Sequence, residues 1–253
     1  MEIMESSPPV ATPPERVRIV VAGRAWATPA LIGLNACAFL WMLWRGVGLF
    51  GPDGQQALAL GANEYHAVRL EGQWWRLVTS TFLHGGILHL AVNMWALRVL
   101  GPFIEAYLGP PAFLALYLVS GVAASVVSIH WDHDVVSLGA SGSIFALLGA
   151  HLAFFVRHRS ELPRAVFRAQ VRNVLMLIGL NVLLGLSIPH IDNAAHLGGL
   201  AWGILGGFLL DRDLLAVPRM GMRRWLGAAG LALLIPPLAF AVGIASALVH
   251  GRG

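Results

Sequence analysis

The sequence predicts an all-α, polytopic membrane protein. Hydrophobic residues make up 57% of the 253 residues, and charged residues make up only 12%. Soluble domains carry about 25% charged residues, so this chain has too little charge to cover a water-facing surface. It also contains seven apolar runs that approach the length of about 20 residues needed to cross a bilayer. The composition excludes an ordinary soluble enzyme, a disordered protein and a nucleic-acid binder with a basic patch.

The expected elements follow in chain order. Residues 1–25 are polar and proline-rich, and we expect a disordered cytoplasmic tail there. The runs expected to span the membrane are 28–50, 86–104, 110–130, 141–157, 171–188, 194–211 and 225–248. Two prolines open the third run, and Ser141 opens the fourth. The connection at 51–85 is long for an unstructured loop, so we expect it to be partly ordered at the membrane interface, where Trp74 and Trp75 would meet the headgroups.

The distribution of arginine sets the expected orientation. All 17 basic residues are arginine, and thirteen of them are assigned to the side of the N-terminus. Cytoplasmic loops of membrane proteins carry the excess of basic residues. We therefore expect a cytoplasmic N-terminus and, with an odd number of spans, an external C-terminus. The expected location is the bacterial cell (inner) membrane.

Polar side chains inside the expected spans are the candidates for function, because they are costly in a bilayer. His89 and Asn93 are four residues apart, so they project from one helical face, and both can donate a hydrogen bond to an oxyanion. Ser141 has a glycine on its C-terminal side and another two residues before it, which lets a substrate backbone approach. His196 can take the proton of a serine hydroxyl.

Small residues recur at helical spacing in two of the runs. The fourth run contains Gly142, Ala146 and Gly149, and the sixth contains Gly199, Gly203 and Gly207. Such stripes let membrane helices pack closely. A hydrogen bond between Ser141 and His196 would require close packing of these two runs, although the same stripes also occur in ordinary membrane packing.

Four motifs together resemble the rhomboid family of intramembrane serine proteases. They are Trp75-Arg76; His84 followed by His89 and Asn93; Gly139-Ala140-Ser141-Gly142; and Ala195-His196 followed by Gly199 and Gly203. Each motif alone is weak, but the four occur in the family's order. The resemblance covers about residues 28–211, which would form the family's six-helix core. The seventh run corresponds to an extra C-terminal transmembrane helix that some members carry.

The resemblance implies three regions: the tail at 1–25, a six-span catalytic core at 26–215, and the seventh span with an external C-terminus at 216–253. It also implies a role for each residue of the motifs. Ser141 would be the nucleophile and His196 the general base of a dyad.

The remaining residues of the motifs would support the dyad. His89, Asn93 and the Ser141 backbone N–H would form the oxyanion hole, with Gly139 beside them. The resemblance gives supporting roles to His84, Trp75, Arg76, Phe145, Gly199 and Gly203. In the family, an aromatic ring at position 145 stacks on the catalytic histidine; active members often have Tyr there.

The expected function is hydrolysis of peptide bonds in transmembrane segments of membrane proteins. The partners would be these substrates and the lipid bilayer, with no nucleic acid, metal or organic cofactor. The oligomeric state stays open. Zinc-dependent and aspartyl intramembrane proteases are disfavoured, because the chain lacks His-Glu-x-x-His and its six aspartates fall in expected loops or span ends.

Several alternatives remain open. The chain could be a catalytically inactive rhomboid-like protein that binds membrane clients, or a transporter or channel that uses the polar cluster as a pathway. Asp192 could orient His196 or be a solvated loop carboxylate. The histidines and aspartates of residues 130–134 could hold a metal or form a solvated loop.

Overall fold

The apolar runs of the sequence form helices in the computed structural model, which describes residues 25–187 and 191–210. The helices are α1 (Ala27–Trp44), α2 (Gly54–Leu60), the π-helix η1 (His66–Leu70), α3 (Arg76–Thr79), α4 (Ile87–Leu108), α5 (Pro110–Trp131), α6 (Ser141–Arg157), α7 (Arg164–Ser187) and α8 (Asn193–Leu209). The seventh run and nearly all of the expected tail lie outside the described residues.

Four of the described helices are long and apolar enough to cross a membrane, namely α1, α4, α5 and α7. The helix α6 is also apolar but has 17 residues, and α8 has the same length. The chain is therefore an integral membrane protein whose described elements are helical. Each of the six expected runs within residues 25–187 and 191–210 coincides, apart from its ends, with one of these six helices.

Two helix boundaries differ from the predicted ones. The first run was expected to continue to residue 50, but α1 ends at Trp44 because Gly46 adopts a φ of +90°. The N–H groups of Gly46 and Val47 bond back to Leu43 and Met42, which is a glycine-based helix stop. The fifth run was expected to begin at residue 171, but α7 begins at Arg164, directly after Pro163. Hydropathy marks only the apolar part of this helix, whose first two turns are rich in arginine.

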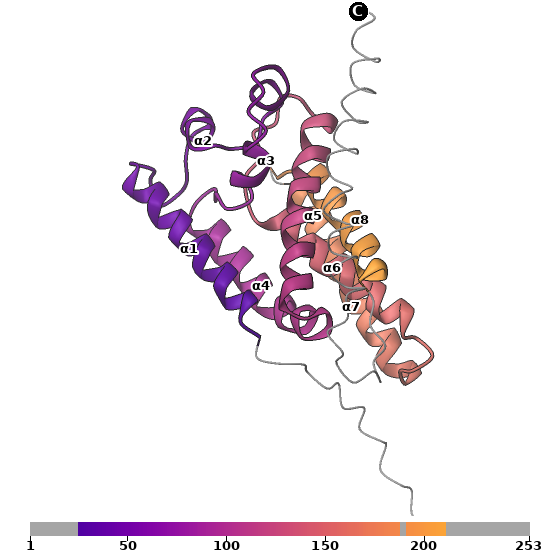
Figure 1. Cartoon of the computed structure of the whole chain (residues 1–253). Coiled ribbons are helices and arrows are strands. Elements are labelled where there is room, and N and C mark those ends of the chain that lie inside the picture. Colours follow the sequence, from indigo (N-terminus) through magenta and orange to yellow (C-terminus); the bar gives the residue numbers. More distant parts are fainter. Residues whose placement is uncertain (1–24, 188–190, 211–253) are drawn as a thin grey trace, which may run out of the picture.

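The long helices form a bundle in which α6 and α8 lie against each other and α5 packs on both (Figure 1). The pair α1 and α4 lies on the other side of α5. The main core joins α1, α4, α5 and α6, with Tyr117, Phe113, Phe154 and Leu97 among its fully buried side chains.

The connection between α1 and α4 folds into α2, η1 and α3, which gather at one end of the bundle (Figure 1). Two backbone hydrogen bonds, of 2.9 and 2.8 Å, join Asn63 in this connection to Ser137, just before α6. The buried Asn63 side chain also donates to the carbonyl of Ser125 on α5, at 2.9 Å. The connection is thus tied to the segment that leads into Ser141.

At the opposite end of α4, the buried carboxylate of Glu105 caps α1. It accepts hydrogen bonds of 2.7 to 2.8 Å from the backbone N–H groups of Trp26, Ala27 and Thr28 and from the Thr28 hydroxyl. The first N–H groups of a helix have no partner within it, and its N-terminus favours negative charge. A side chain from another helix satisfies them here, so Glu105 fastens α1 to α4.

Replacing Glu105 with alanine should destabilise the protein strongly. The change leaves several buried donors without an acceptor, and we expect a loss of about 3 kcal/mol or more in the free energy of unfolding. Reversible unfolding in detergent micelles measures this. The matched change Glu71→Ala removes an exposed glutamate and should cost less than about 0.5 kcal/mol. Equal stability of the two variants would contradict the capping role.

Candidate active site

Ser141 is the first residue of α6, and the backbone before it is held in place by the connection between α1 and α4. Gly139 has a φ of +133°, a conformation that favours glycine. Its N–H donates to the carbonyl of Ser80 at 2.9 Å. The sequence Gly139-Ala140-Ser141 therefore enters the helix in a fixed geometry, and the Ser141 side chain is half-buried.

His196 lies in the first turn of α8 and is only 7% exposed. Its ring stacks on the ring of Phe145, with centroids 4.2 Å apart and planes inclined by 7°. Phe145 is one helical turn after Ser141, so both project from the same face of α6. The stack thus holds the imidazole beside the face of α6 that carries the serine.

Glycines let α6 and α8 approach to backbone contact next to these two residues. A Cβ atom on Gly199 would collide with the carbonyl oxygen of Gly142, and one on Gly203 would collide with the carbonyl oxygen of Ala146. Gly142 directly follows Ser141, and Gly199 is three residues after His196. The two predicted small-residue stripes therefore face each other.

Within the described residues, no hydrogen bond joins the Ser141 hydroxyl to the His196 ring. His196 Nδ1 is buried and has no hydrogen-bond partner among these residues. Catalytic hydrogen bonds are often long in the absence of substrate and tighten in the complex.

The His89 ring lies against the backbone that leads into Ser141. A Cβ atom on Gly139 would lie 2.8 Å from His89 Cε1 and 3.1 Å from Nε2. The N–H of Gly85 donates to His89 Nδ1 at 3.1 Å. Because Nδ1 accepts, the proton of the neutral ring lies on Nε2, the nitrogen that faces Gly139. This places a hydrogen-bond donor within two residues of Ser141.

Asn93 is one turn further along α4 and is 5% exposed. One amide N–H donates to the carbonyl of His89 at 2.9 Å. An asparagine amide has two N–H groups, so a second remains for another acceptor. His84 contacts the His89 ring edge to face, with centroids 5.3 Å apart.

The ring of His84 is fully buried between α3 and α4. Its Nδ1 bonds to the carbonyl of Phe82 at 3.1 Å. Burial lowers the pKa of His84 to about 4, so the ring is neutral at neutral pH. A neutral ring with Nδ1 as the donor supports the segment that leads into α4.

Arg76 ties the outer connection together from within. Its guanidinium donates to the carbonyls of Leu58 and Ala62, at 2.7 and 3.0 Å, and to the Gln73 side chain at 2.6 Å. The group also lies 4.8 Å from the centre of the Trp75 ring. Trp75 and Arg76 thus hold α2 and α3 together. Both residues are far from Ser141 in the sequence.

Asp192 is the N-cap of α8. One carboxylate oxygen accepts from the N–H of Ala195 at 2.9 Å. No hydrogen bond joins this carboxylate to the His196 ring within residues 25–187 and 191–210. Asp192 therefore caps the helix that carries His196.

Two histidines away from Ser141 contact other side chains. His133 stacks on Tyr65 at a centroid distance of 3.8 Å. His158 lies between Glu161 and the hydroxyl of Tyr107, at 2.9 and 3.2 Å. In the part of the chain that the structure describes, no three potential metal ligands come together.

Sequence reasoning missed Glu105, although an acid next to an apolar span is a signal that could have found it.

Comparisons with known proteins agree with the resemblance. A family model described as "Rhomboid domain" matches residues 71–213. The Arabidopsis thaliana protein named "RHOMBOID-like protein 5" is 33% identical over 247 residues, which cover 87% of this chain and 77% of that protein. "RHOMBOID-like protein 6, mitochondrial" from the same plant is 34% identical, covering 74% of this chain and 69% of its own length. "Rhomboid protease GluP" of Bacillus subtilis (strain 168) is 37% identical, covering 65% of this chain and 30% of that protein.

Proposed function

The chain belongs to the rhomboid family, and we propose that it is an intramembrane serine endopeptidase with Ser141 and His196 as a catalytic dyad. The observation that carries the proposal is the backbone contact between Gly142 and Gly199, combined with the Phe145–His196 stack. These two contacts support the proposal because they join α6 to α8 next to Ser141 and His196. Polar residues in membrane-spanning helices are costly, so those that occur are candidates for function.

The dyad performs acyl transfer in two steps. His196 removes the proton of the Ser141 hydroxyl as its oxygen attacks the scissile carbonyl, and the protonated ring then gives that proton to the leaving amine. Water hydrolyses the resulting ester with His196 again as the base, which returns the free serine. The stacked Phe145 ring restricts the imidazole to one plane during both proton transfers.

The negative oxygen of the tetrahedral intermediate is stabilised by hydrogen-bond donors beside Ser141. His89 Nε2–H faces Gly139, and Asn93 lies one turn away on the same face of α4. These two side chains and the Ser141 backbone N–H form the proposed oxyanion hole. Such donors act most strongly in the transition state, where the oxygen carries its charge.

Removing an oxyanion donor should lower turnover with little change in KM. We expect a loss of up to about 100-fold for Asn93→Ala, and more for His89→Ala, since one such donor is worth about 10²–10³ in rate. The matched control is Asn181→Ala, because Asn181 makes the same bond to its own helix, to Leu177 O at 2.8 Å. Kinetics with a fluorogenic substrate measure turnover and KM for each variant. If Asn93→Ala and His89→Ala both kept wild-type turnover, or changed KM alone, Asn93 and His89 would have a structural role.

The substrate is proposed to be a transmembrane segment of another protein. A helical backbone is already hydrogen-bonded, so the segment must unwind near the scissile bond before Ser141 can attack. We propose residues 26–215 as the catalytic core with six spans, preceded by the tail at 1–25 and followed by a seventh span at 216–253.

The proposed orientation places the N-terminus in the cytoplasm and the C-terminus outside a bacterial cell membrane. The five arginines of residues 157–172, at the end of α6, in the connection and in the first turns of α7, support it. Cysteines introduced at residue 5 and at residue 160 should react only with membrane-permeant reagents in intact cells, and one after Gly253 should react with impermeant reagents. Protection of the C-terminal cysteine from impermeant reagents would contradict the proposed seventh span.

Cleavage of a single-span substrate by the purified protein tests the proposed function. Two products are expected, whose masses sum to the mass of the intact substrate plus one water molecule. Binding of the substrate without cleavage would instead favour the inactive, client-binding alternative.

A further inference from the structure

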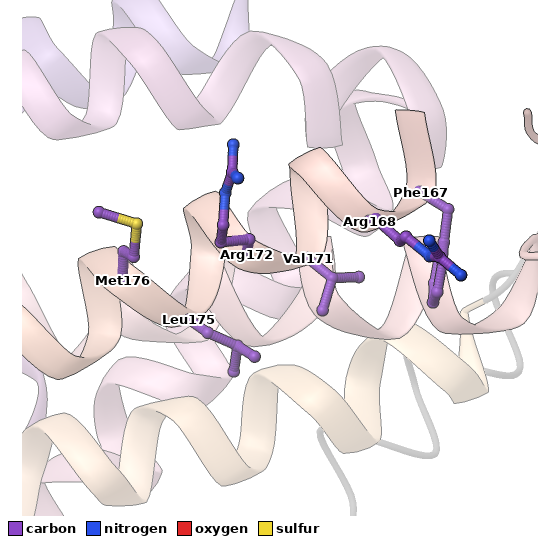
Figure 2. A pocket seen from close by; sticks show the side chains of 6 residues that line it. All are labelled: Phe167, Arg168, Val171, Arg172, Leu175 and Met176. Carbon is purple, nitrogen blue, oxygen red and sulfur yellow. The ribbon is translucent and has the colours of Figure 1, made fainter. Parts of the chain in front are cut away.

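The arginine-rich end of α7 carries a groove that the proposed function does not use. It is shallow and mostly open, with a volume of about 470 Å³, and the described residues that line it come from one helix (Figure 2). The lining residues are Phe167, Arg168, Val171, Arg172, Leu175 and Met176.

The groove combines positive charge with an apolar surface in a fixed order along the helix. Arg168 and Arg172 are exposed and one turn apart. Neither pairs with a carboxylate among the described residues. Further along α7, Leu175 is 51% exposed and Met176 is 65% exposed. The charge therefore lies near the start of a membrane-spanning helix, and the apolar surface continues from it toward the middle of the span.

The inner wall of the groove is anchored to the protein core. Phe167 and Val171 are partly buried and pack against the main core cluster. They fix the rotation of α7, so that both arginines lie beside the apolar surface and not on opposite faces. This arrangement distinguishes the groove from a uniformly charged helix end.

The groove lies at the end of the bundle away from Ser141. The helix α6 runs from Ser141 to Arg157, a rise of about 25 Å at 1.5 Å per residue, and α7 starts seven residues after Arg157. In the proposed orientation this end faces the cytoplasm, where the membrane leaflet is rich in anionic lipids. A ligand there would not touch the reacting atoms.

We propose that this groove binds one anionic phospholipid. The phosphate accepts hydrogen bonds from the guanidinium groups of Arg168 and Arg172, and an acyl chain lies along Leu175 and Met176. A zwitterionic lipid carries a compensating ammonium group, and free phosphate leaves the apolar part of the groove unused. The arrangement of charge and apolar surface thus selects a lipid with net negative charge.

Native mass spectrometry of the purified full chain in detergent micelles tests this proposal. Phosphatidylglycerol and phosphatidylcholine with the same acyl chains are titrated separately, and the fraction of protein with one bound lipid is measured. We expect phosphatidylglycerol to bind about tenfold more tightly, and we expect this preference to disappear in the double variant Arg168→Gln/Arg172→Gln. The matched variant Arg98→Gln/Arg159→Gln removes the same charge elsewhere and should retain the preference.

The other outcomes overturn the proposal. Equal binding of the two lipids by the wild-type chain contradicts it. This holds even if another part of the chain fills the groove. So does a preference that survives in the double variant, or one that is lost equally in the matched variant. Displacement of phosphatidylglycerol by millimolar inorganic phosphate would indicate an anion site without a lipid. Cleavage of the single-span substrate, measured on the same samples, tests the proposed function separately.

Discussion

Replacing Ser141 with alanine should abolish cleavage of a single-span substrate while the protein remains folded. The change removes the attacking oxygen, and we expect activity to fall by at least about 10⁴-fold. Folding should persist because Ser141 makes no hydrogen bond through its side chain in the described residues, and alanine fits wherever serine does. Cleavage rate and thermal stability in the same detergent measure the two effects.

The matched control for this prediction is Ser143→Ala, which makes the same substitution two residues further along α6. The Ser143 hydroxyl is buried and has no partner among the described residues. Its removal should leave cleavage within about twofold and stability within about 1 kcal/mol, because no hydrogen bond is lost. Undiminished cleavage by Ser141→Ala would remove the serine from the mechanism, and equal losses in both variants would point to packing.

Replacing Gly199 with alanine should move Ser141 and His196 apart without changing either residue. The added Cβ atom would collide with the Gly142 carbonyl oxygen and lie 2.8 Å from its carbon, so α8 must move away from α6. We expect a loss of about 100-fold in cleavage, since a displacement of about 1 Å at a reacting pair has an effect of that size. The cost in the free energy of unfolding should be about 1–3 kcal/mol.

Gly179 on α7 provides the control for this second prediction. A Cβ atom there would meet nothing within 4 Å, and alanine is favoured over glycine inside a helix. Gly179→Ala should therefore leave cleavage unchanged and stability equal or slightly higher. If Gly199→Ala retained full activity, close contact of α6 and α8 would not be needed to assemble the site.

The sequence predicted those features that depend on local pattern. The apolar run at 141–157 coincides with α6, because its first residue follows a glycine-rich turn and its last precedes a polar segment. The two small-residue stripes indicated that close helix packing was possible, and α6 and α8 do approach to backbone contact along them. The start of α7 was missed because its first turns are charged and lie outside the apolar run, although Pro163 marks that boundary.

Contacts between distant segments were beyond local patterns. The capping of α1 by Glu105 joins residues 77 to 79 positions apart, and no periodicity encodes such a partner. Asp192 was considered because of its spacing from His196, but it caps its own helix, which is a common role of aspartate at that position. The tautomer of His89 depends on the N–H of Gly85, and only the folded backbone shows that bond.

Mapping the adduct of a serine-directed fluorophosphonate by mass spectrometry tests the proposed dyad most directly. The reagent reacts with a serine that a neighbouring base has activated. We predict one adduct, on the peptide that contains Ser141, and a loss of at least about 100-fold in its rate of formation in His196→Ala. An adduct on any other serine, or labelling of Ser141 at an unchanged rate without His196, would contradict the account.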